Sequence, residues 1–95
     1  MPQWKTVEHL EGHFTAHRRE FPRLSIALYD ASAQETFAVG VRFSFRDRRT
    51  GLPRVGYFHR ESSRMTVVDG DGFIVSHFRT DEEYVTLLPR STYCD

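Results

Sequence analysis

The sequence has very little cysteine, and this excludes the two commonest ways of cross-linking a small domain. Its one cysteine, Cys94, cannot form an internal disulfide and cannot by itself make a structural zinc site. No apolar run approaches the roughly 18 residues that indicate a membrane span, and the N-terminus lacks the apolar centre of a signal peptide. These absences predict a soluble, cytoplasmic protein, although a fragment of a larger exported protein would look the same.

Lysine is also nearly absent, because Lys5 stands against 12 arginines. The net charge is zero, but residues 39–68 carry seven arginines against two acidic residues, and residues 69–95 carry two arginines against six. A neutral total argues against indiscriminate binding to nucleic acid, while the basic middle third leaves room for a local phosphate-binding face. Solvated arginines on strand surfaces would explain the same count.

The 95 residues are enough for one compact domain, residues 1–95, with a two-layer core. Thr6 is the predicted N-cap of a first helix, which Pro22 ends. Its apolar face has a spacing of three or four residues: Val7, Leu10, Phe14, His17 and Phe21. Ser25 is the predicted N-cap of a second helix.

The period then changes to alternation, which is typical of strands. Strands are predicted at residues 39–46, 54–60, 64–68 and 73–79, and the "DGDG" of residues 69–72 favours a tight hairpin. Thr80 with Glu83 indicates a capping box before a short terminal helix that Pro89 ends. The predicted fold is α+β, with two N-terminal helices packed on one face of a four-stranded antiparallel β-meander and a short C-terminal helix.

The stretch "EHLEGHFTAHRREF" places a histidine at every fourth position: His9, His13 and His17. Two histidines four apart on a helix can chelate one ion, with Glu8, Glu11 or a distant residue as a third ligand. However, no HExxH pattern is present, and Gly12 lies between the first two histidines. No metal or cofactor is therefore predicted. His17 falls on the apolar stripe, where it is either a hydrogen-bonded residue at the core edge or a catalytic group facing the sheet.

The fourth predicted strand supplies a second polar cluster. Strict alternation places Phe73, Val75, His77 and Arg79 on one face and Ile74, Ser76 and Phe78 on the other. On the second strand, Tyr57 and His59 share one face, and Phe58 and Arg60 share the other. His77 and Arg60 are therefore candidate phosphate-binding residues, with solvated strand positions as the alternative.

Two motifs resemble those of a known family. "HFTAHRREF", followed by Ser25, Tyr29 and Ala33, and then "RMTVVDGDGFIVSHFR" are similar to the elements "HFxxHxxEF" and "FxVVDxDGxIxTxF(K/R)". These elements occur in small bacterial toxin domains of the barnase/EndoU/colicin/RelE superfamily, which are metal-independent ribonucleases. The resemblance covers roughly residues 11–80, and this chain has Ser76 where the family usually has threonine.

The resemblance implies cleavage of RNA, with tRNA or mRNA as the target, by attack of the 2′-hydroxyl on the adjacent phosphate. Such a reaction needs a base, an acid and cationic donors for the phosphoryl oxygens. It implies His17 as base or acid with His13 as the alternate, and Arg79 and Ser76 on the scissile phosphate. Arg18 is a further candidate RNA contact, at a position where the family more often has glycine. An immunity protein, antitoxin or other protein partner is also expected. The alternative is a non-catalytic interaction or regulatory module of the same fold.

Overall fold

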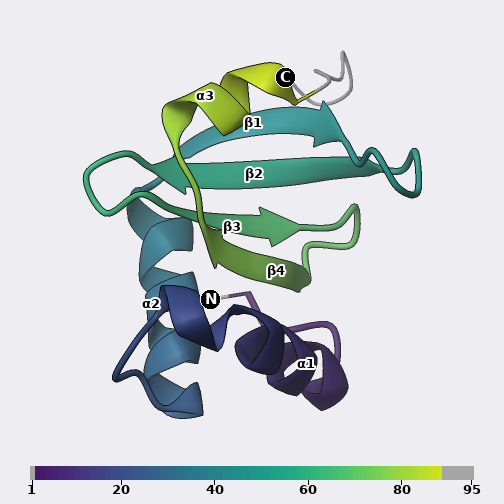
Figure 1. Cartoon of the computed structure of the whole chain (residues 1–95). Helices are drawn as coiled ribbons and strands as arrows, with labels where there is room; N and C mark the ends of the chain where they lie inside the picture. Colours follow the sequence, from purple (N-terminus) through teal and green to yellow (C-terminus); the bar gives the residue numbers. More distant parts are fainter. Residues whose placement is uncertain (1, 89–95) are drawn as a thin grey trace.

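A computed structural model describes residues 2–88, so the expectations for Pro89 and Cys94 lie outside the described residues. This part of the chain is α+β, with helices packed around a four-stranded antiparallel sheet (Figure 1). The sheet has the strand order β1-β2-β3-β4, which is the predicted meander. The elements are α1 (Val7–His17), the 3-10 helix η1 (Arg18–Glu20), α2 (Ile26–Val39), β1 (Val41–Arg46), β2 (Pro53–His59), β3 (Arg64–Val68), β4 (Ile74–Arg79) and α3 (Glu82–Leu87).

The first two helices begin where their capping residues predict. The Thr6 hydroxyl accepts a hydrogen bond from the backbone N–H of His9 at 3.0 Å, and the Ser25 hydroxyl accepts one from Leu28 at 3.2 Å. Each bond satisfies a backbone donor that has no partner inside the helix. Helix α1 then continues through Gly12 without a break.

Several predicted boundaries are wrong by one or a few residues. Strand β2 lies one residue earlier than predicted, β4 starts one residue later, and α1 ends at His17, with η1 between it and Pro22. Helix α2 runs on to Val39, so β1 begins only at Val41. The N-cap of α3 is Asp81, whose carboxylate accepts from the backbone N–H of Tyr84 at 2.9 Å, and Thr80 is not the cap. The Thr80 N–H donates to the carbonyl of Ser63 at 2.9 Å. Thr80 is therefore tied to the turn between β2 and β3, and the helix starts one residue later than predicted.

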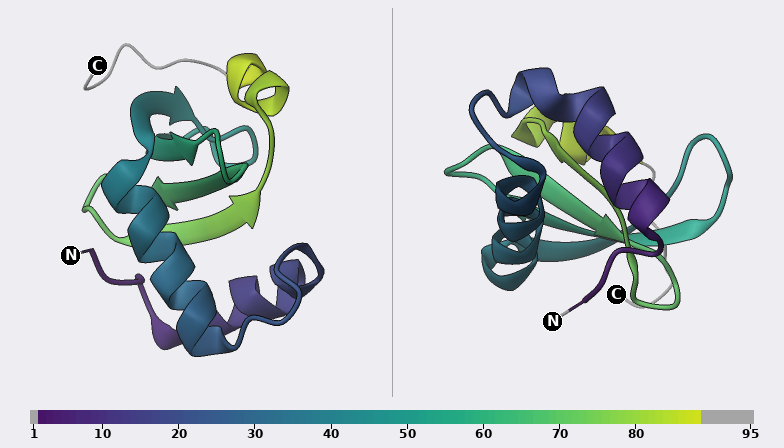
Figure 2. Two further views of the ribbon diagram at one scale, coloured as in Figure 1. Left: turned by 90° about the vertical axis from the view of Figure 1, so that its left-hand side faces the viewer. Right: turned by 90° about the horizontal axis from the view of Figure 1, so that it is seen from below.

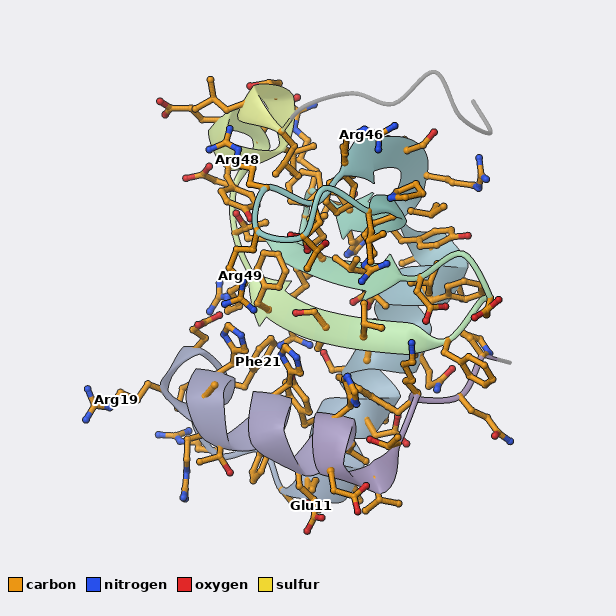
Figure 3. The ribbon with its side chains drawn as sticks, turned by 90° about the vertical axis from the view of Figure 1, so that its right-hand side faces the viewer. Glu11, Arg19, Phe21, Arg46, Arg48 and Arg49 are labelled. Carbon is orange, nitrogen blue, oxygen red and sulfur yellow. The ribbon has the colours of Figure 1, made fainter. Side chains whose placement is uncertain are left out.

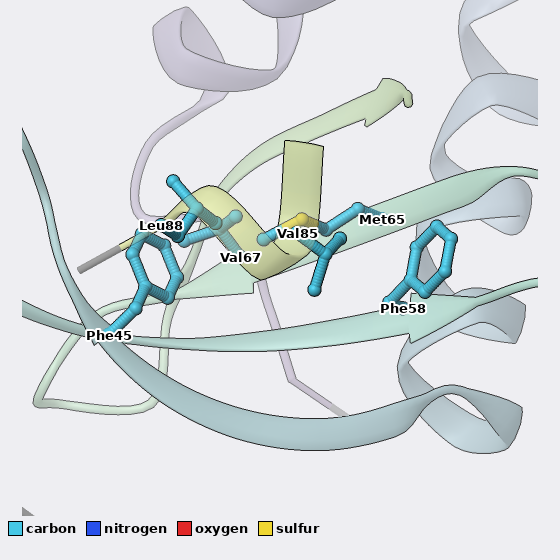
Figure 4. Packing of buried hydrophobic residues seen from close by; sticks show 6 residues of the cluster. All are labelled: Phe45, Phe58, Met65, Val67, Val85 and Leu88. Atoms are coloured by element: carbon cyan, nitrogen blue, oxygen red, sulfur yellow. The ribbon is translucent and has the colours of Figure 1, made fainter. Parts of the chain in front are cut away.

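Helices cover both faces of the sheet, with α2 and α3 on opposite sides (Figure 2). One cluster lies beneath α3 (Figure 4) and consists of Phe45, Phe58, Met65, Val67, Val85 and Leu88. The other lies beneath α2 and contains Ala33, Val68 and Ile74, with Phe37 and Tyr57 packed against them. Phe58 and Tyr57 belong to different clusters, as their alternation along β2 predicts.

Helix α1 lies along β4, the edge strand nearest to it (Figure 1). At the start of β4, Ile74 donates to the carbonyl of Gln3 at 2.8 Å and accepts from Lys5 at 3.0 Å. At its end, the backbone N–H of Arg79 donates to the Glu20 carboxylate at 2.8 Å. Because these contacts follow the same order in both segments, α1 and β4 run in the same direction. Helix α1 thus covers an edge that would otherwise be open to another strand.

A β-bulge in β4 changes which side chains share a face. Val68 pairs with Ile74 and Val67 pairs with Ser76, so Val75 is the extra residue. Ile74 therefore lies on the α2 face together with His77, and the prediction that strict alternation separates these two residues is wrong. The bulge precedes both Ser76 and Arg79, so these two remain on opposite faces.

Candidate functional site

The three histidines of α1 form one row of rings, here called the histidine row: His9, His13 and His17. The His13 and His17 ring centroids are 5.8 Å apart, and their planes differ by only 6°. His9 and His13 are 6.5 Å apart, with planes 17° apart. Residues four apart share one helix face, so an unbroken α1 brings the rings together. The row of rings continues onto the sheet, because the ring centroids of Phe78 on β4 and His17 are 5.8 Å apart.

His13 is the middle member of the row and is half-buried. Its Nδ1 lies 3.4 Å from the hydroxyl oxygen of Ser76 on β4, and its ring lies 6.0 Å from that of Trp4. Burial lowers the pKa of His13, and the positive charges that His17, His9 and Arg49 can carry lower it further. His13 is therefore neutral at pH 7 and can accept a proton.

His17 is held by a carboxylate. Its Nδ1 is 2.6 Å from one oxygen of Glu20, and the other oxygen of Glu20 accepts the backbone N–H of Arg79. The His17 side chain is 25% exposed, so it lies at the surface of the site and not inside the core. Glu20 brings His17 and the end of β4 together and fixes the orientation of the imidazole.

The predicted arginines lie at three different places. Arg79 is exposed, and its side chain is on the opposite sheet face from Ser76. Arg18 is exposed on η1, with its guanidinium 5.8 Å from the centre of the Phe14 ring. Arg60 is 3.5 Å from the Glu82 carboxylate, and a pair so exposed contributes little to stability. Ser76 is thus the one predicted phosphate ligand that directly contacts the histidine row.

His77 is predicted from sequence as a phosphate-binding residue, and the structure places it in the core with none of its surface exposed. Its Nε2 is 2.9 Å from the Ser32 hydroxyl, and its Nδ1 is 3.0 Å from both the Thr66 hydroxyl and the Met65 carbonyl. Burial lowers the pKa of His77 to about 3. Both ring nitrogens are occupied, so the side chain has no room for a substrate.

Two residues at the site have no assigned role in the sequence prediction. Glu20 lies three residues after His17, a spacing that permits a helical pair, and it also falls within the "HFxxHxxEF" element. Arg49 lies on the loop of residues 47–52, and no sequence pattern connects it to the histidine row. Arg48 contacts α3 through the carbonyl of Leu87, and in the view of Figure 3 Arg49 lies between α3 and α1. The positive charge of Arg49 is also one of the causes that lower the pKa of His13.

Comparison with known proteins gives no further assignment. No family model matches the chain, and no curated protein matches it either. Within residues 2–88, no three side chains of histidine, cysteine, aspartate or glutamate come together in a way that could hold a metal ion. In the same range, no helix has the length and apolar character needed to cross a bilayer.

Proposed function

We propose that this chain is a small metal-independent endoribonuclease. One observation carries the proposal: two nearly parallel imidazoles, 5.8 Å apart, lie beside a hydroxyl on a sheet edge. Cleavage of RNA by its own 2′-hydroxyl needs one group to remove a proton and a second group to supply one. A pair of histidines meets both requirements without a metal ion.

His13 is assigned as the base. Its burial keeps the ring neutral at pH 7, so that it can take the proton from the 2′-hydroxyl. The 2′-oxygen then attacks the adjacent phosphorus and forms a 2′,3′-cyclic phosphate. The Ser76 hydroxyl, which already contacts His13, donates a hydrogen bond to a phosphoryl oxygen as charge builds there.

His17 is assigned as the acid. Its Nδ1 is occupied by Glu20, which leaves Nε2 to deliver a proton to the departing 5′-oxygen. The products are a cyclic phosphate on one fragment and a 5′-hydroxyl on the other, so protons balance between the two histidines. In this assignment Arg18, Arg60 and Arg79 contact the flanking RNA, where exposed guanidinium groups suit phosphates.

The test is cleavage of a short fluorescent RNA by purified protein in excess EDTA. We expect His13→Ala and His17→Ala each to lower the cleavage rate by about 10²–10⁴-fold. His9→Ala is the control from the same row: His9 transfers no proton in this assignment and acts only through the effect of its charge on the pKa of His13, so the rate should change by no more than about threefold. Wild-type cleavage should yield a 2′,3′-cyclic phosphate, and an all-deoxy substrate should remain intact.

Loss of cleavage in EDTA with recovery on adding a divalent ion would exclude the metal-free reaction. Undiminished cleavage by a protein lacking both His13 and His17 would exclude the assignment of these residues.

A second candidate is a non-catalytic module that binds another protein. It is favoured by Val39 and Val41, which are 54% and 74% exposed where α2 meets the edge strand β1. The variants above separate the two functions, because a binding module that arrests a host cell would do so equally well without His13 and His17. A ribonuclease would lose this effect along with its cleavage activity.

A further inference from the structure

Arg49 lies on a loop whose other anchors are already occupied. Within residues 47–52, the Asp47 carboxylate accepts the backbone N–H groups of Arg49 and Thr50 at 2.7 and 3.1 Å. Arg46, just before the loop, donates to the carbonyl of Gly51 at 2.7 Å. The guanidinium of Arg48 donates to the carbonyl of Leu87, which fastens the loop to α3. The loop is therefore ordered by its own hydrogen bonds.

The guanidinium of Arg49 is not used in this way. In residues 2–88 it makes no hydrogen bond and no ion pair, and Arg49 takes part in the loop through its backbone alone. Its charge also acts on Asp47. Burial raises the pKa of the Asp47 carboxyl, but two backbone hydrogen bonds and the charges of Arg54 and Arg49 lower it more, so the pKa stays below its usual value. An arginine that a fixed loop presents with no hydrogen-bond or ion-pair partner among residues 2–88 is suited to bind an anion.

The loop that carries Arg49 lies on the same face of the sheet as Ser76, which contacts the histidine row. Ser76 pairs with Val67, which belongs to the cluster beneath α3, so the Ser76 side chain lies on the α3 face. The loop that carries Arg49 is fastened to α3 on this same face (Figure 3). Arg79 pairs with Arg64, three residues from Val67 and therefore on the opposite face.

We propose that Arg49 is the residue that binds the reacting phosphate of RNA at the histidine row, together with Ser76 and His13. This inference rests on the proposed function for the identity of the substrate, and it gives to Arg49 the role that sequence resemblance gives to Arg79. The ligand class is inorganic phosphate, a phosphate monoester or a phosphodiester. A guanidinium can donate two hydrogen bonds to such a group while it neutralises charge on the phosphoryl oxygens.

The test is a titration that needs no catalysis. Inorganic phosphate and then a nucleoside 3′-monophosphate are added, and the ring NMR signals of His13 and His17 report binding. Arg49→Ala should weaken phosphate binding by about 10- to 100-fold, as expected for loss of a charged hydrogen bond, and Arg49→Lys should recover part of the loss. Arg23→Gln, which removes an exposed arginine from the segment between η1 and α2, is the charge-matched control and should leave the affinity within about twofold.

The outcomes separate this inference from the proposed function. If the unmodified protein does not cleave RNA, but phosphate shifts its His13 signals and this shift depends on Arg49, then the assignment of Arg49 stands and the ribonuclease proposal fails. If the protein cleaves RNA and Arg49→Ala binds phosphate and cleaves normally, the Arg49 assignment is overturned. It is equally overturned if Arg79→Ala weakens phosphate binding while Arg49→Ala does not, or if phosphate leaves the His13 signals of the unmodified protein unchanged.

Discussion

At the scale of single residues, His77 has its protonation state set by the groups around it. The guanidinium of Arg64 can only donate, and it donates to the Ser32 hydroxyl oxygen at 2.7 Å. The Ser32 hydroxyl proton is therefore free to be donated to His77 Nε2, which accepts it. The Thr66 hydroxyl donates to the carbonyl of Ala33 at 2.8 Å, so it can only accept from His77 Nδ1. The ring is therefore neutral, with its proton on Nδ1.

This arrangement makes stability depend on pH. The pKa of His77 is about 3 in the folded protein and about 6.5 in the unfolded chain. Between these values the unfolded state binds the extra proton, so the free energy of unfolding falls as the pH drops from about 6.5 toward 3. The contribution approaches about 1.4 kcal/mol per pH unit. NMR should show the His77 ring neutral at pH 5, with its proton on Nδ1.

A comparison of denaturant unfolding at several pH values gives a second measurement. His77→Asn should show a smaller fall in stability between pH 6 and pH 4 than the unmodified protein shows. If the variant does not fold, NMR of the unmodified protein still tests the prediction that His77 stays neutral. A His77 ring that protonates near pH 6.5 would contradict the buried hydrogen-bond network.

The residue scale also shows what sequence can predict of the site. The spacing of four between His13 and His17 suffices to place both rings on one helix face, and both do lie together. Arg49 could not be found in this way, because its approach to His13 depends on how the loop of residues 47–52 is fastened to α3. For His77, alternation indicates a face, but it does not tell whether a helix covers that face.

At the scale of elements, two glycines predict opposite effects of the same substitution. Gly12 lies in the middle of α1 with no atom within 4 Å of an added Cβ. At Gly40, where α2 turns into β1, an added Cβ would lie 2.7 Å from the Thr36 carbonyl oxygen and 2.9 Å from the Tyr57 carbonyl carbon. Both of these close atoms belong to the backbone, so they cannot move aside easily.

Gly12→Ala should therefore raise the free energy of unfolding by about 0.5–1 kcal/mol, because alanine favours a helix over the unfolded chain. Gly40→Ala should lower it by about 1–3 kcal/mol, as overpacking does. Urea denaturation of both variants measures the two changes. Equal effects at the two positions would show that the α2–β1 junction is not closely packed.

Local signals predicted most of the elements, since caps, turns and hairpins depend on neighbours in the chain. Thr6 and Ser25 begin their helices as predicted, and β3 has the predicted bounds. The bulge at Val75 leaves no such signal. It follows from the pairing of β4 with β3, and it is the reason why strict alternation misplaces Ile74.

At the scale of the whole molecule, α1 is the most weakly anchored of the longer elements. None of its residues is buried, whereas β3 at the centre of the sheet has four consecutive buried residues, Met65 to Val68. Elements with little buried apolar surface open locally before the rest of the protein unfolds. The histidine row therefore lies on an element that can open while the sheet stays folded.

Hydrogen exchange should reveal this difference. We expect the backbone amides of α1 to exchange at least about tenfold faster than those of β3 once intrinsic rates are removed. The buried turns of α2 around Tyr29 and Ala33 serve as the internal control, because they belong to a helix that is anchored in the core. Equal protection of α1 and β3 would mean that α1 opens only when the whole domain unfolds.

The parallel run of α1 beside β4 couples the lengths of two segments that are about sixty residues apart in the chain. Four residues of helix advance about 6.0 Å and two residues of strand about 6.6 Å, which is why His13 lies opposite Ser76 and His17 opposite Phe78. Adding one residue to α1 turns the later side chains of the helix by about 100°. Adding one residue to β4 moves the later side chains of the strand to the other face of the sheet. An insertion or deletion between His13 and Glu20 is therefore tolerated only when the strand changes with it. Four residues added to or removed from the helix need two residues added to or removed from the strand between Ser76 and Arg79.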